Sequence, residues 1–111
     1  MPLFNAMVFA GEEFVAQLDG WWPELGVGLE VDSREWHMSP EDHAKTLARG
    51  RRIGIHQIIV LRFTPRQIRT EPRKVIKDIQ RTLDGARGRR SLNLRTVPAS
   101  PDRNVVALTR L

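Results

Sequence analysis

Residues 27–63, "VGLEVDSREWHMSPEDHAKTLARGRRIGIHQIIVLRF", decide the fold because they predict a strand, a helix and a second strand in succession. In "VGLEVD" (27–32) apolar residues alternate with glycine or acids, which is the two-residue period of a half-buried strand. "IIVLRF" (58–63) is almost continuously apolar, which is typical of a strand buried on both faces. This order favours a right-handed crossover and a parallel pairing of the two strands.

The helix between these strands has a clear start. Ser39 is a typical N-cap residue, Pro40 suits the first helical position, and Asp42 places an acid three residues after the cap. We expect the helix to run to about Arg52 and to end before Gly54.

Three strands are expected before that helix. Residues 3–10 and 13–18 are short apolar runs on either side of Gly11-Glu12 and predict a hairpin. Residues 19–26, "DGWWPELG", carry the glycines and proline of a loop that leads into strand 27–32.

After residue 63 the sequence predicts helices and then a tail. Residues 64–67, "TPRQ", form a second capping pattern, and a longer helix is expected from about residue 71 to 84. We therefore expect an α/β (α+β) domain over residues 1–86, with one mixed sheet in the order β-β-β-α-β-α. Residues 87–111 are basic and irregular, and we expect a flexible tail there.

Composition limits the class of protein. A length of 111 residues suits one domain, and 41% apolar with 28% charged residues indicates a folded chain. Without cysteine there is no disulfide framework and no thiolate metal site. No apolar run suggests a membrane span or a signal peptide, so we expect a cytoplasmic protein without a membrane partner.

The net charge of +5 is unevenly distributed. Residues 1–44 hold nine acids and one base, whereas residues 45–111 hold seventeen bases and four acids. The basic part would attract a nucleic acid, and the acidic part would repel it unless divalent cations neutralise the carboxylates. A charged surface followed by a basic tail explains the same distribution.

Four residues around the third strand form a candidate catalytic group. Strand parity places Asp19, Glu30 and Asp32 where neighbouring antiparallel strands could bring them to one end of the sheet. Hard carboxylate oxygens suit Mg²⁺ or Mn²⁺, and His37 could then serve as a general base or acid. An ordinary half-exposed strand edge explains the same spacing, so these residues alone leave both interpretations open.

The motifs resemble a known family. "LDGWWPELGVGLEVDSREWHMSPEDHAKTLARGRRI" (18–53) and "GIHQIIVLRFTPRQIRTEPRKVIKDI" (54–79) resemble an actinobacterial domain family of unknown function. That family is related to the very-short-patch repair endonucleases of the PD-(D/E)XK, or restriction-endonuclease-like, superfamily. The resemblance covers about residues 3–84 and implies a nuclease domain that hydrolyses nucleic-acid phosphodiesters with Mg²⁺ or Mn²⁺, on DNA rather than RNA.

The resemblance also implies roles for individual residues. Asp19 falls on the metal-binding aspartate and Glu30 on the (D/E) position. Asp32 stands where the superfamily usually has a lysine, and it could ligate the metal while His37 handles the proton. His37 is similar to the histidine of the repair endonucleases, and Trp36 matches the aromatic residue before it.

Two departures support an alternative function. An aspartate at position 32 cannot supply the positive charge of a lysine, and the superfamily's first core helix is absent from this sequence. The alternative is a catalytically inactive nucleic-acid-binding or toxin–antitoxin regulatory module with the same fold. The missing helix also suggests a fragment of a longer protein with an N-terminal DNA-binding region, or a homodimer that covers the exposed sheet.

Arg49 and Arg52 on the first helix are the candidate phosphate contacts. Trp36 could stack on bases or pack against the protein, whereas Trp21 and Trp22 beside Pro23 are expected to pack.

Overall fold

The computed structural model describes residues 1–32 and 39–98 of the chain. Its elements, in chain order, are β1 (Leu3–Ala10), β2 (Glu13–Trp22), β3 (Val27–Val31), α1 (Pro40–Ile55), β4 (Ile59–Phe63), α2 (Pro65–Thr70), α3 (Pro72–Ala86) and β5 (Arg95–Val97). Within the described ranges, no helix has the length and apolar character needed to cross a membrane.

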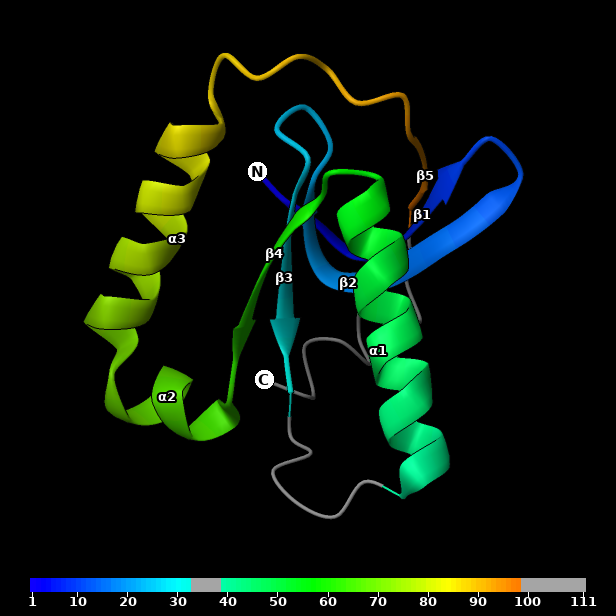
Figure 1. The fold of residues 1–111 in the computed structure, drawn as a ribbon. Helices are drawn as coiled ribbons and strands as arrows, with labels where there is room; N and C mark the ends of the chain where they lie inside the picture. The colour runs from blue at the N-terminus through cyan, green and yellow to red at the C-terminus, as the bar shows by residue number, and fades with distance from the viewer. Residues whose placement is uncertain (33–38, 99–111) are drawn as a thin grey trace.

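The strands form one mixed sheet of five strands in the order β4-β3-β2-β1-β5 (Figure 1). β2 pairs antiparallel with β1 and β3, and β5 pairs antiparallel with β1. β3 and β4 are parallel, with Glu30 opposite Arg62. The predicted mixed α and β class and the parallel crossover are therefore confirmed.

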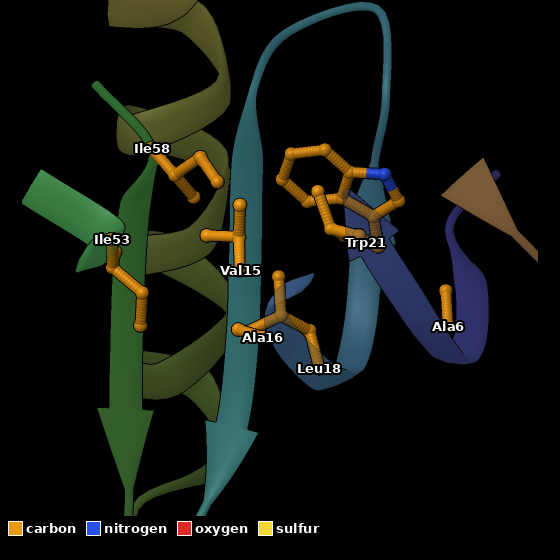
Figure 2. Close-up of a cluster of buried hydrophobic side chains, with 8 residues drawn as sticks. Ala6, Val15, Ala16, Leu18, Trp21, Ile53 and Ile58 are labelled. Atoms are coloured by element: carbon orange, nitrogen blue, oxygen red, sulfur yellow. The ribbon is translucent and has the colours of Figure 1, made fainter. Parts of the chain in front are cut away.

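The helices α1 and α3 cover opposite faces of the β3–β4 part of the sheet. Glu30 of β3 contacts Arg49 of α1. Leu61 and Phe63 of β4 line a cavity together with residues of α3. Glu30 is opposite Arg62 in the sheet, so the two side chains share a face. Leu61 and Phe63, on either side of Arg62 in β4, point to the other face because alternate residues of a strand do so. Figure 2 agrees, since α3 passes behind the strands, away from the labelled core side chains.

The main core lies between β1, β2 and α1. Its buried side chains come from both hairpin strands, the end of α1 and the residue before β4 (Figure 2): Ala6, Val8, Val15, Ala16, Leu18, Trp21, Ile53 and Ile58. Val15 and Ala16 are adjacent in sequence and both fully buried. The register explains this, because Val8 pairs with Ala16 but Phe9 pairs with Phe14, which leaves Val15 as the extra residue of a β-bulge.

Two sequence predictions about the strands are wrong. Residues 19–22 continue β2 instead of forming a loop, and the turn is confined to the residues after Trp22. Trp21 is 0% exposed, so its burial against the core holds this segment in the sheet. β4 is not buried on both faces, because Phe63 is its only buried residue and Ile59 is 39% exposed.

The segment before residue 98 is also more ordered than a flexible tail. Leu92 and Leu94 pack against the core, and β5 adds to the edge of the sheet beside β1. The indole Nε1 of Trp21 donates to Oγ1 of Thr96 at 2.9 Å. The expected flexible tail therefore does not hold for residues 92–97, because apolar side chains and this hydrogen bond fix them.

Replacing Thr96 with valine should lower the free energy of unfolding by about 1–3 kcal/mol, because the buried indole N–H of Trp21 would lose its acceptor. Thr96→Ser keeps the hydroxyl and should lose less. Urea denaturation of both variants and the wild type measures the difference. Equal stability of Thr96→Val and Thr96→Ser would show that the hydrogen bond does not hold β5.

Candidate site at the carboxyl end of β3

Glu30 is held by two guanidinium groups. Arg49 Nη1 donates to Glu30 Oε2 at 3.0 Å, and Arg49 Nη2 donates to Glu30 Oε1, so that Arg49 engages both carboxylate oxygens. Arg62 Nε lies 3.3 Å from Glu30 Oε2. Arg62 comes from β4, where the parallel register places it opposite Glu30. One negative charge is therefore matched by two positive charges.

Helix α1 brings Arg49 to this position. The Ser39 side chain accepts a hydrogen bond from the backbone N–H of Asp42 at 3.1 Å, as predicted for the N-cap. Ile53, one turn after Arg49, is buried in the core and fixes the rotation of the helix. The same face of α1 therefore presents Arg49 to the sheet.

Arg49 and Arg52 also bind the backbone of β2. Arg49 Nη2 donates to the carbonyl of Gln17 at 3.2 Å, and Arg52 Nε donates to the carbonyl of Val15 at 3.3 Å. Both arginines, selected from the sequence as phosphate contacts, thus join α1 to the sheet within the protein. Arg52 thus helps to attach α1 to β2. Among the described residues, it makes no hydrogen bond or ion pair with Glu30.

Asp19 and Asp32 lie at the same end of the sheet. Asp19 Oδ2 accepts a hydrogen bond from the backbone N–H of Val31 at 2.8 Å, which places the Asp19 carboxylate at the end of β3. The next residue, Asp32, donates its backbone N–H to the carbonyl of Phe63 at 2.8 Å and so continues the pairing with β4. The Asp19 carboxylate and the backbone of Asp32 thus lie at the same end of the sheet.

These carboxylates do not form a compact trio. Among residues 1–32 and 39–98, no three side chains of His, Cys, Asp or Glu are grouped closely enough to hold a metal ion. Glu30 is directed to Arg49 and Arg62 instead. His37 and Trp36, the other two predicted site residues, lie outside the described residues.

The sequence suggests Arg62 only as one of several arginines that could contact phosphates, and its ion pair with Glu30 was not predicted. Its signal was the parallel crossover, since aligning 27–31 with 59–63 places position 62 opposite position 30. Arg62 also borders a cavity of about 420 Å³ between β4, α2 and α3, which is lined by Leu61, Arg62, Phe63, Gln67, Asp78, Arg81 and Thr82. Arg62 therefore connects the Glu30 site with a hollow on the edge of the sheet.

Comparison of the chain with protein-family models, curated proteins and solved structures finds no match.

A double-mutant cycle between Glu30→Gln and Arg49→Gln should give a coupling energy of about 1 kcal/mol, because the pair is half-buried and bidentate. The cycle is measured by chemical denaturation at low and high salt, and the coupling should fall as salt rises. The Asp84–Arg87 pair, with side chains 70% and 73% exposed, is the matched control and should give a smaller coupling. Equal coupling in the two cycles would contradict the special strength of the Glu30 pair.

Proposed function

We propose that this chain is a nuclease-like domain that hydrolyses nucleic-acid phosphodiesters with a divalent metal ion, on DNA in preference to RNA. The strand–strand–strand–helix–strand order agrees with the core implied by the resemblance to the very-short-patch repair endonucleases, apart from the first core helix, which the sequence lacks. One observation carries the proposal. The hydrogen bond from Val31 N–H to Asp19 Oδ2 brings the Asp19 carboxylate of β2 to the end of β3, at the residue that precedes Asp32.

The donor chemistry of this end of the sheet fits Mg²⁺ or Mn²⁺. Such ions are commonly held in nucleotide and polymerase sites by one or two carboxylates, with waters and a substrate phosphate completing the shell. Asp19 and Asp32 would be the two protein ligands. Glu30 fits the role of a third ligand only when Arg49 and Arg62 release its oxygens.

When bound, the ion would activate a water and stabilise negative charge on a phosphate oxygen. The residues of the chain have other tasks in this proposal. Asp19 and Asp32 would position the ion, and the basic residues after position 44 would attract the polyanionic substrate. His37 is the proposed proton carrier, and it lies outside the described residues.

A second candidate is a metal-independent nucleic-acid-binding or regulatory module. The observation that favours it is the pairing of Glu30, whose negative charge is already matched by Arg49 and Arg62. A carboxylate compensated in this way does not need a metal ion. Asp32 in place of a lysine supports the same candidate, since the superfamily's positive charge is absent there.

Calorimetric titration with MnCl₂ should show binding to the wild type and a loss of at least about tenfold in affinity in Asp32→Asn, because one of two proposed ligands is removed. Asp84→Asn on α3 makes the same chemical change away from the site and should bind as the wild type does. Circular dichroism confirms that all three proteins are folded. Equal Mn²⁺ affinity in the wild type and Asp32→Asn would refute the metal site.

Binding to duplex DNA separates the two candidates. Fluorescence anisotropy with a labelled oligonucleotide should show affinity that falls as salt rises, because phosphate contacts release counterions. The nuclease proposal expects cleavage with Mg²⁺ and none with chelator. Binding that is unchanged by chelator, without cleavage under any metal condition, would favour the binding module.

A further inference from the structure

We propose that Arg49 and Arg62 form a phosphate-binding site, which Glu30 fills in the free protein and a backbone phosphate of the bound nucleic acid takes over. This inference rests on the proposed nucleic-acid function. It adds that the two arginines exchange Glu30 for a phosphate when the nucleic acid binds. Glu30 would act as an internal substitute for the substrate's phosphate.

The geometry of the pair suits this exchange. Arg49 engages both oxygens of Glu30, which is the two-point contact that a guanidinium makes with either a carboxylate or a phosphate. Arg62 adds a contact from the neighbouring strand. A phosphate anion could therefore occupy the same donors after Glu30 leaves.

The exposure of the three side chains permits exchange. Arg62 is 43% exposed, Arg49 25% and Glu30 17%, so solvent reaches the pair and an anion can approach. Because the ion pair is not fully withdrawn from water, its strength is moderate: greater than that of a fully exposed pair, yet small enough for a competing phosphate to overcome.

Loss of the Glu30 contact would leave α1 in place. Arg49 also binds the carbonyl of Gln17, Arg52 binds the carbonyl of Val15, and Ile53 is buried in the core. These contacts with β2 and the core do not involve Glu30. The exchange therefore needs a change in side-chain partners only.

The exchange links substrate binding to metal binding. A displaced Glu30 carboxylate would remain at the end of β3 that Asp19 also reaches and that Asp32 follows, and added negative charge there favours a cation. DNA should then increase the affinity for Mn²⁺, and Mn²⁺ should increase the affinity for DNA by the same factor, because such coupling is reciprocal.

The decisive experiment measures DNA binding in the presence of chelator. Glu30→Gln removes the competing charge, so its affinity for a short duplex oligonucleotide should rise about fivefold over the wild type. Glu24→Gln, in the exposed turn at the other end of β3, changes the net charge equally and is the control. An equal rise in both variants, no rise in Glu30→Gln, or no DNA binding by any of the proteins would overturn the exchange.

A second variant tests whether the effect passes through Arg49. In the Arg49→Gln background, Glu30→Gln should raise DNA affinity by less than it does in the wild type, because part of the phosphate site is already gone. Thermal denaturation verifies that each variant is folded. An undiminished rise would show that Glu30 acts only through long-range charge, which contradicts the exchange.

A Mn²⁺ titration with and without DNA separates this inference from the proposed hydrolysis. If Glu30→Gln strengthens DNA binding as expected but Mn²⁺ never binds, the exchange stands and the metal-dependent function fails. If Mn²⁺ binds and DNA is cleaved while Glu30→Gln leaves DNA affinity unchanged, the function stands and the exchange fails.

Discussion

The parallel pairing of β3 with β4 is the constraint on which the rest of the structure depends. A parallel neighbour requires the chain to cross over the sheet, and α1 makes that crossing. Because α1 makes this crossing, it covers one face of β3 and β4, and α3 covers the other face. The same register sets Glu30 opposite Arg62. Fold and charge arrangement thus follow from one pairing.

The sequence predicted those helices and strands whose characteristic pattern or cap lies within the element itself. The alternation in residues 27–32 gave β3, and Ser39 and Thr64 marked helix starts that the structure confirms. The bulge at Val15 and the strand β5 were not predictable in this way. Each depends on a partner far away in the chain, and a three-residue strand such as β5 carries too few residues for a periodic pattern.

The candidate site was predictable to a similar extent. The hydrogen bond from Val31 N–H to Asp19 Oδ2 joins Asp19 to the end of β3, and it depends on the register of β2 with β3, which the alternation of residues does not set by itself. The partners of Glu30 were not predicted, because they require the rotation of α1 and the register of β4 together. Sequence patterns thus predict where a residue lies along its strand. Its contacts with residues of other elements depend on how those elements pack, which the patterns do not contain.

The docking of β5 has a consequence for the time at which the domain can form during synthesis. β1 leaves the ribosome well before its outer neighbour β5, because α1 and α3 lie between them in the chain. The acceptor for the Trp21 indole is likewise made late, at Thr96. Pairings between such distant segments slow folding and prolong exposure of sheet edges. The outer edge of the nascent β1–β2 hairpin therefore stays uncovered until β5 has been synthesised.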